Sequence, residues 1–509
     1  MRPHIPLPRQ TPASPPFRPL SSLAVLLSFT LLGSTPAQTQ NSPASSQSPS
    51  ASLLAAPEPQ LRDNGAVTLG NTPAHLLPLL AAPSIHPQGS PAAQTTLTIA
   101  TVNNGDMIVM QRLSKQFEHD HPDIHLDWVV LEEKILREKT TTDAAAHGGQ
   151  FDVVTIGPLE APIWGRRGWL VPLEGKLSPA YDLHDLLQPI RDGASFAGHL
   201  YALPFYAESS LTYFRKDLFA NAGLSMPAQP TYDDIARFAR VLNDPAHDVY
   251  GICLRGKPGW GENMAYISTV VNTFGGRWFN ESWRPQFDTP EWHAAVSLYI
   301  NLLQKYGPPG SSSNGFNENL TLFENGRCAM WIDATVAAGT LSDPKQSKVT
   351  ATVGFAPAPI AVTPRGSQWL WFWGLAVPSS SKHPAAALQF IEWATSKNYI
   401  RLVESTTGWA SAPPGTRQST YRQPEYIAAA PFADLTYRSI LAADPLHPTS
   451  KPVPYIGIQC IVIPSFPTIG NQVGQLLAAA LVGSISVEEA LGKAQLATDR
   501  VLHRTGIPQ

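Results

Sequence analysis

The sequence predicts an α/β fold built on a parallel sheet. Three short apolar segments read as strands, at residues 96–102, 124–130 and 151–156. Segments whose apolar side chains recur at helical spacing separate them. Strand, helix, strand, helix and strand within about 60 residues require crossover connections, and such connections place consecutive strands in parallel with helices on the sheet faces.

Each of these first elements has its own signal. After the strand TLTIATV, a helix is expected near Met107, because apolar side chains repeat every three or four residues as far as Phe117 and Pro122 then stops it. Residues 124–130 alternate apolar and polar side chains, which is typical of a strand with one buried face. A second helical stretch is expected to end near Ala146, before the apolar strand FDVVTI.

Three later helices are also predicted. Thr231 and Asp234 have the spacing of a capping box at a helix start. Pro290 suits the first turn of a helix that should run to about Tyr306, and a third helix should begin near Pro384. No internal repeat of 20 to 50 residues is present, which excludes solenoids and propellers.

The start of the chain has the pattern of an export signal. Residues 20–32 form an apolar run that is preceded by arginines and followed by small residues up to Ala37. This pattern predicts a signal peptide at residues 1–37, removed after Ala37, and a soluble exported protein. Residues 38–94 are rich in Ser, Ala and Pro, and we expect them to be disordered. No cysteine lies near the cleavage position to accept a lipid.

The charge balance does not favour a polyanionic partner. The chain has 36 Lys and Arg against 39 Asp and Glu, a net charge of −3. Neither nucleic acid nor an anionic membrane surface is therefore an expected partner. The cysteines are Cys253, Cys328 and Cys460, too few for a disulfide framework or a zinc site. Three buried thiols are the favoured expectation, and one bridge with one free thiol stays open.

Sequence motifs of common enzyme classes are absent. Residues 256–259 (GKPG) lack the spacing of a phosphate-binding loop, and neither G-x-S-x-G nor H-E-x-x-H occurs. His119, His121 and His125 surround a proline and are expected to form a solvated turn, not a metal site. A glycoside hydrolase needs only two carboxylates, so that class stays open.

Aromatic side chains stand beside carboxylates and amides in four segments. A sugar or polyol needs such a mixture, because its hydroxyls both donate and accept hydrogen bonds while its C–H edges pack on aromatic faces. The segments are ALPFYAESS with Phe205, Tyr206 and Glu208; GWGEN with Trp260, Glu262 and Asn263; AMWID with Trp331 and Asp333; and QWLWFWG with Trp369, Trp371 and Trp373.

A purely structural interpretation competes for several of these residues. In QWLWFWG the three tryptophans share one face of a strand, and a strand covered on both faces explains them without a ligand. Glu208 and Asp333 favour a polar contact more strongly, because a carboxylate within an apolar run is costly to bury unless something hydrogen-bonds to it.

Seven sequence segments resemble those of a known protein family. The segments are TLTIATVNNGDM (96–107), FDVVTIGPLEAPIWGRRGWLVPL (151–173), LYALPFYAESSLTYFRKDLF (200–219), YGICLRGKPGWGENMA (250–265), NTFGGRWF (272–279), SSNGFNENL (312–320) and CAMWIDATVAAG (328–339). In them the chain resembles the extracellular solute-binding proteins of bacterial ABC transporters, within the sugar-binding family 1 that includes maltodextrin binders. The resemblance covers residues 95–503 and is greatest to the sorbitol- and mannitol-binding members, through RGKPGWGEN and SSNGFNENL.

The resemblance implies a two-lobed periplasmic-binding-protein fold of type II, in which each lobe is a mostly parallel sheet flanked by helices and the solute sits between the lobes. Three chain crossings are expected, near 204–208, 354–357 and 408–411. The first lobe is then expected to comprise residues 95–205 plus 355–410, and the second lobe 206–354 plus 411–509.

The implied function is that of the substrate-binding component of an ABC uptake transporter. It would bind sorbitol, mannitol or a related sugar in the periplasm and deliver it to the permease subunits, as a monomer without catalysis, cofactor or metal. An oligosaccharide-binding protein and a secreted glycoside hydrolase are the alternatives. Solutes bind at the carboxyl ends of strands in such sheets, which adds three residues after the first strand, although helix capping also explains them. The candidate ligand-binding residues are Asn103, Asn104, Asp106, Tyr206, Glu208, Trp260, Asn263, Asp333, Trp369 and Trp371.

Overall fold

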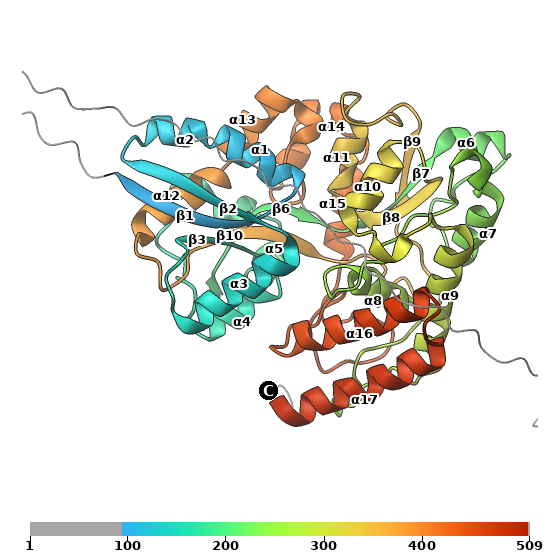
Figure 1. Ribbon diagram of the computed structural model, residues 1–509. Coiled ribbons are helices and arrows are strands. Elements are labelled where there is room, and N and C mark those ends of the chain that lie inside the picture. Colours follow the sequence, from blue (N-terminus) through green and yellow to red (C-terminus); the bar gives the residue numbers. More distant parts are fainter. Residues whose placement is uncertain (1–93, 507–509) are drawn as a thin grey trace, which may run out of the picture. The chain divides into compact units, whose positions relative to one another are not determined.

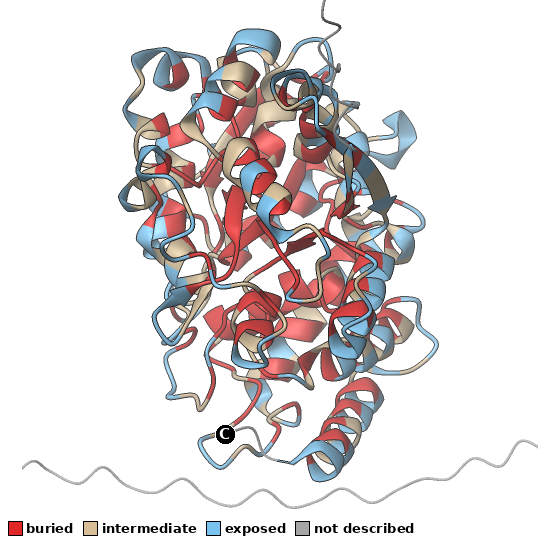
Figure 2. Cartoon of the chain, turned by 90° about the vertical axis from the view of Figure 1, so that its left-hand side faces the viewer, coloured by how far each residue is buried: buried red, intermediate tan, exposed pale blue. Residues whose placement is uncertain are grey.

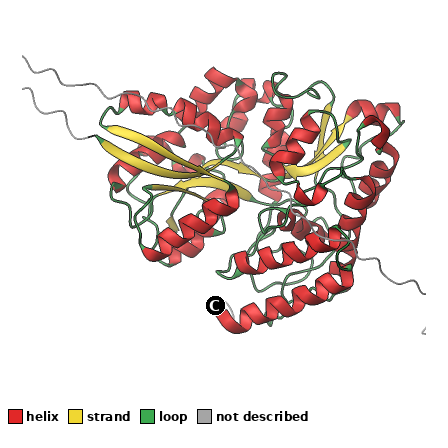
Figure 3. Cartoon of the chain, viewed as in Figure 1, coloured by secondary structure: helices red, strands yellow, loops and turns green. Residues whose placement is uncertain are grey.

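The computed structural model describes residues 94–506 and contains two main sheets. One has five strands in the order β2-β1-β3-β10-β6, and the other has three in the order β8-β7-β9. Figure 3 shows the strands gathered in these separate groups, each with helices around it. We call the five-stranded sheet with its helices the first lobe, and the three-stranded sheet with its helices the second lobe. The expected signal peptide and the Ser/Pro-rich segment fall outside the described residues.

The first sheet confirms the predicted parallel crossovers. β1 (Thr95–Val102) pairs in parallel with β2 (Ile124–Leu131) on one side and with β3 (Val153–Ile156) on the other. Two strands from later in the chain complete the sheet. β10 (Trp371–Ala376) runs antiparallel to both β3 and β6 (Leu203–Glu208). The side of this sheet that is formed by β10 and β6 is therefore built from segments far from β1–β3 in the sequence.

Helices cover both faces of the first sheet. The helix expected after β1 is two helices that meet at Ser114, α1 (Gly105–Leu113) and α2 (Lys115–Asp120). Figure 1 shows α1, α2 and α13 above the sheet and α3 and α4 below it. The other helices of this lobe are α3 (Glu133–Ala146), α4 (Glu160–Arg166), α5 (Gln188–Gly193), α12 (Pro384–Ala394) and α13 (Lys397–Thr407).

The second sheet differs from the expectation, because it is antiparallel. β7 (Ser210–Arg215) pairs antiparallel with β8 (Met330–Ala334) and with β9 (Val353–Pro357). The register explains this direction. β7 begins at the crossing from β6 and runs away from it, whereas β8 and β9 run back and end opposite Ser210 and Leu211.

Strand pairing also moves two predicted crossings. We expected the second crossing at 354–357, but β9 pairs with β7 throughout this segment. The chain therefore returns to the first sheet between β9 and β10, after Pro357. The first crossing, expected near 204–208, also lies later, because β6 pairs with β10 as far as Glu208 and only Ser209 separates β6 from β7.

Helices make up most of the second lobe. The capping box at Thr231 is confirmed, since its hydroxyl accepts from the Asp234 N–H and the Asp234 carboxylate accepts from the Thr231 N–H. The helix expected from Pro290 to Tyr306 also forms. The helices are α6 (Lys216–Asn221), α7 (Tyr232–Leu242), α8 (Asn263–Thr273), α9 (Pro290–Tyr306), α10 (Phe316–Glu324), α11 (Ala337–Ser342), α14 (Pro424–Ala429), α15 (Ala433–Ala442), α16 (Phe466–Leu481) and α17 (Val487–Thr505).

The strands of both sheets are largely buried. Figure 2 shows buried residues along the strands and on the inward sides of the helices, with exposed residues on the outside. No helix among residues 94–506 is long and apolar enough to cross a lipid bilayer. The histidines expected in a solvated turn are divided among three places, because His119 is exposed in the last turn of α2, His121 ends that helix and His125 lies exposed in β2.

The cysteines differ from the favoured expectation. Cys253 and Cys328 form a disulfide, and Cys460 is a buried free thiol. The error has a tertiary cause, because 75 residues separate the two bonded cysteines and only the fold brings their Cα atoms to 5.9 Å. Cys328 lies just before β8, and Cys253 forms a parallel bridge with Trp331 on that strand. The disulfide thus fastens the segment around Cys253 to the second sheet.

Candidate functional site

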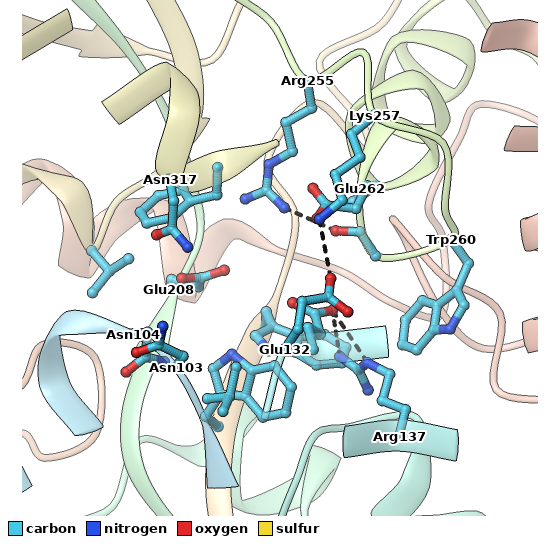
Figure 4. A pocket seen from close by; sticks show the side chains of 18 of the residues that line it. Asn103, Asn104, Glu132, Arg137, Glu208, Arg255, Lys257, Trp260, Glu262 and Asn317 are labelled. Atoms are coloured by element: carbon cyan, nitrogen blue, oxygen red, sulfur yellow. Dashed lines mark hydrogen bonds and ion pairs between the residues drawn. The ribbon is translucent and has the colours of Figure 1, made fainter. Parts of the chain in front are cut away.

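A cavity of about 270 Å³ lies between the lobes. Its first-lobe wall comes from the residues that follow β1 and β2, and its second-lobe wall comes from the loop before α8 and the start of α10. Strands β6 and β10 contribute the side chains nearest the crossing. Figure 4 shows Arg255, Lys257 and Glu262 reaching in from one side and Asn103 and Asn104 from the other.

Asn104 is both a helix cap and a wall of the cavity. Its Oδ1 accepts a hydrogen bond from the Met107 N–H at 2.9 Å, which caps α1. Its Nδ2 donates to the Tyr206 hydroxyl at 3.2 Å. The capping interpretation of this residue and its place beside the cavity are therefore compatible. Asn103 is exposed beside it and also lines the cavity.

Glu208 is a buried carboxyl at the end of β6. Its side chain lines the cavity, and among the described residues no hydrogen bond or ion pair reaches its oxygens. Burial raises the pKa of Glu208 to about 8, although the nearby Arg255 guanidinium opposes this. No side chain or backbone group of the described residues therefore partners the Glu208 carboxyl, and such burial is costly unless a bound molecule supplies a partner.

Arg255 is fixed in place by Asp333. Its Nε and Nη2 donate to the two carboxylate oxygens over 2.6–3.1 Å, and its Nη1 donates to the Gly261 carbonyl at 2.9 Å. Asp333 is fully buried and also accepts from the Trp331 indole N–H at 3.1 Å. Burial alone would lower the pKa of Arg255, but the Asp333 carboxylate outweighs it and raises that pKa. Asp333 thus affects the cavity indirectly, because it holds Arg255 in position.

An aromatic wall closes the cavity near the crossing. Trp369, Trp371 and Trp373 all line it, and Leu370 and Phe372 between them are buried. The guanidinium of Arg255 lies 5.5 Å from the Trp369 ring centroid. The wall is therefore apolar with a cationic edge.

Ionised groups of both lobes meet at one side of the cavity. Lys257 of the second lobe places its Nζ 3.0 Å from Glu132 of the first lobe and 3.2 Å from Glu262 of its own. Burial raises the pKa of Glu262 to about 7, while Arg255 and Lys257 oppose this. Burial lowers the pKa of Lys257, but the two carboxylates outweigh this and raise it.

The cavity brings together seven of the ten candidate residues. Those that line it are Asn103, Asn104, Tyr206, Glu208, Trp260, Trp369 and Trp371.

Asp106, Asn263 and Asp333 do not line this cavity. Asp106 borders a separate small cavity, and burial raises its pKa to about 7. Asn263 is fully buried, where its Oδ1 accepts from the Gly259 N–H and its Nδ2 donates to the Gly474 carbonyl. The sequence indicated that these positions are polar. It did not indicate that α1 turns Asp106 away from the cavity, or that Asn263 holds the loop at Gly259 in place.

A family model for bacterial extracellular solute-binding proteins matches residues 104–399, more than half of the chain. The chain belongs to this family.

Individual relatives agree with this membership. A mannitol-binding protein of Pseudomonas aeruginosa is 56% identical over 433 residues, which are 85% of this chain and 97% of the relative. A crystal structure of an ABC transporter solute-binding protein from Agrobacterium vitis S4, with bound D-mannitol, is 55% identical with a TM-score of 0.80 over 82% of this chain and 100% of that one. A protein from Agrobacterium radiobacter K84 in complex with ribitol is 26% identical with a TM-score of 0.71, over 81% and 100%.

Sequence reasoning missed more than half of the cavity wall of this solute-binding protein. Glu132 and Glu133 follow β2 as Asn103 and Asn104 follow β1, so the same rule of strand ends could have found them. Other missed residues lie within or beside the family phrases RGKPGWGEN and SSNGFNENL, which was a usable signal. Gln459 had none, because it comes from a long loop near the end of the chain. The missed polar, charged and aromatic residues are Glu132, Glu133, Arg137, Arg255, Lys257, Phe316, Asn317, Glu318 and Gln459.

Proposed function

We propose that this solute-binding protein is the substrate-binding component of an ABC uptake transporter, and that it carries a hexitol such as mannitol or sorbitol to the permease. The observation that carries the proposal is the Glu208 carboxyl, which has no hydrogen-bond partner among the described residues and lines a small cavity with polar groups on both lobes. The two relatives above 50% identity support the choice of solute, because one is named a mannitol-binding protein and the structure of the other contains bound D-mannitol.

The chemistry of the wall suits a chain of hydroxyl groups. Each hydroxyl donates and accepts, so it can give its hydrogen to Glu208 and receive one from Asn104, Asn317 or Arg255. The C–H edges of the solute would pack on Trp369 and Trp371. Carboxylates and cations interleave around the cavity, which favours an uncharged solute over an ion.

The proposed mechanism is conformational. Polar groups of both lobes would hold one solute, so the solute would bridge the lobes and shift an open form toward a closed form. The closed form would dock on the permease subunits. We propose that the protein works as a periplasmic monomer, catalyses no reaction and needs no cofactor or metal. The chain boundaries of its lobes follow those inferred above, except that the first crossing lies at Ser209 and the second after Pro357.

A thermal-shift panel tests this function. The purified protein would be heated with D-mannitol, D-sorbitol, xylitol, glucose or maltose. A solute present at 100 times its Kd adds about 2.7 kcal/mol to the free energy of unfolding, enough to raise the midpoint visibly. We expect hexitols to raise it. A rise with maltose alone would move the protein to the oligosaccharide binders, and hydrolysis of a glycoside would replace the binding function with an enzymatic one.

A further inference from the structure

A second cavity lies next to the first in the space between the lobes. It measures about 390 Å³, and several residues line both cavities. Six of these shared residues form what we call the seam, three from each lobe. They are Glu132, Glu133 and Arg137 of the first lobe, and Lys257, Trp260 and Gly261 of the second.

The seam is held by contacts that cross from lobe to lobe. Lys257 Nζ lies 3.0 Å from Glu132 Oε1, and the Arg137 guanidinium carbon lies 4.1 Å from the Trp260 ring centroid. Gly261 also approaches the first lobe closely, since a Cβ at this position would lie 2.3 Å from Glu133 Oε1. In Figure 4 Glu132 and Lys257 meet across the cavity, with Arg137 and Trp260 on one side of them and Glu208 and Asn317 on the other. The seam therefore closes one end of the inner cavity, and it does so through contacts between the two lobes.

The outer cavity has a wall that suits a sugar ring. It is lined by Trp164 of α4, Thr141 and Thr142 of α3 and Asn471 of α16, together with the seam. Trp164 itself is buried, and Lys134, Glu138 and Arg167 also line this cavity, so its wall offers mainly hydrogen-bond partners for the hydroxyls of a sugar. The space between the lobes thus continues beyond the seam with compatible chemistry.

We propose that the seam sets the length of the solute, and that Glu132 and Lys257 are its specificity-determining residues. They confine the solute to a single unbranched hexitol in the inner cavity and exclude a hexitol that carries a further sugar ring, which the outer cavity would otherwise receive. The inference rests on the proposed function, because it takes a hexitol as the solute of the inner cavity.

Glu132 and Lys257 are the removable part of the seam. Their side chains are 48% and 35% exposed, so truncating both leaves neither one as an unpaired buried charge. Glu262 loses its contact with Lys257 at 3.2 Å but keeps the nearby Arg255 guanidinium. Arg137 is different, since it is largely buried, pairs with Glu133 and Glu160 and stacks on Trp260. Replacing Arg137 would strand two carboxylates, whereas the double change E132A/K257A leaves the net charge as it was.

The test compares D-mannitol with maltitol, a hexitol that bears one glucosyl ring, by titration calorimetry. Wild-type protein should bind mannitol and give no signal with maltitol. E132A/K257A should bind maltitol at least tenfold more tightly than the wild type does, while its mannitol affinity falls by no more than about tenfold. The matched control is E291A/K451A, which removes another Lys–Glu pair of the second lobe, separated by 2.5 Å and away from both cavities, and should behave as wild type.

The outcomes separate this inference from the proposed function. If E132A/K257A binds mannitol but still rejects maltitol, or if the wild type binds both solutes equally, the seam does not set solute length and the hexitol function stands. If the wild type binds no hexitol, the proposed function fails and this inference fails with it. Should the double variant not fold, the single change Lys257→Ser is held to the same criterion.

Discussion

The buried Asp333 carboxylate holds Arg255 at the wall of the ligand cavity, through Nε and Nη2 contacts of 2.6–3.1 Å. The two residues stand 78 positions apart in the sequence. Asp333 itself is fully buried and lines no part of the cavity. Its role is to orient a cation toward the solute, so its loss should affect both folding and binding.

Replacing Asp333 by Asn should therefore destabilise the protein strongly. Removing one partner of a buried ion pair typically costs about 3–5 kcal/mol, because the other charge is left buried without compensation. Urea denaturation would measure the loss, and calorimetry would show weaker hexitol binding. The control is Asp217→Asn, which breaks the more exposed pair with Arg215 and should cost about 1 kcal/mol or less. Equal effects of the two changes would refute the positioning role of Asp333.

Replacing Glu208 by Gln should separate stability from affinity. The unbound protein should be as stable as the wild type or more stable, because a carboxyl without a partner is no longer buried. Hexitol affinity at about pH 8 should fall roughly ten- to hundredfold, since a hydrogen bond to a charged group contributes about 1.5–3 kcal/mol. Denaturation and calorimetry on the same preparation measure both quantities.

Glu404 supplies the matched control for that change. It is also a buried carboxyl whose oxygens have no hydrogen-bond partner among the described residues, and burial raises its pKa to about 7, but it lines neither cavity between the lobes. Glu404→Gln should share the effect on stability and leave hexitol affinity unchanged. Unaltered affinity in Glu208→Gln as well would remove Glu208 from the binding site.

Stability should fall as the pH rises from about 5 to 8. Burial raises the pKa of Glu208 to about 8 and that of Glu262 to about 7, from 4.5. Between these values the folded chain holds protons that the unfolded chain has released, so the free energy of unfolding decreases by up to about 1.4 kcal/mol per pH unit for each such proton. Denaturation of the unbound protein at several pH values measures the slope. The slope should be shallower in Glu208→Gln, and an identical slope would count against a raised pKa at Glu208.

The protein should contain one titratable thiol before reduction and three after it. Cys253 and Cys328 are bonded to each other, and only Cys460 is free. Thiol counting in denaturant, with and without a reductant, measures this directly. Cys253→Ala with Cys328→Ala should lower the free energy of unfolding by about 2–5 kcal/mol. Three thiols in the unreduced chain would show that the bond does not form.

Local sequence signals predicted the elements of the fold that depend on neighbouring residues. The first three strands and the capping box at Thr231 are examples, because alternation and capping act over a few residues. The direction of β9 depends on where the chain crosses between the sheets, and no nearby residue reports that. The crossing was consequently placed too early.

The candidate site likewise contains residues that local sequence signals could predict and residues that they could not. Asn104 could be found because it follows a predicted strand, and Glu208 because a carboxylate within an apolar run needs a polar partner. Asp333 was found for the right reason, a buried carboxylate that needs a partner, but its partner is Arg255 and not a solute. Lys257 was missed, since its pairing with Glu132 spans two lobes and no local pattern encodes it.

A crystal structure of the protein grown with saturating D-mannitol would test the central claim most directly. We expect one hexitol in the inner cavity, with a hydroxyl within hydrogen-bond distance of Glu208, a second contact from the second lobe, and the Glu132–Lys257 pair still closed. A cavity without hexitol, or a hexitol bound elsewhere while Glu208 stays unpartnered, would contradict the proposed function.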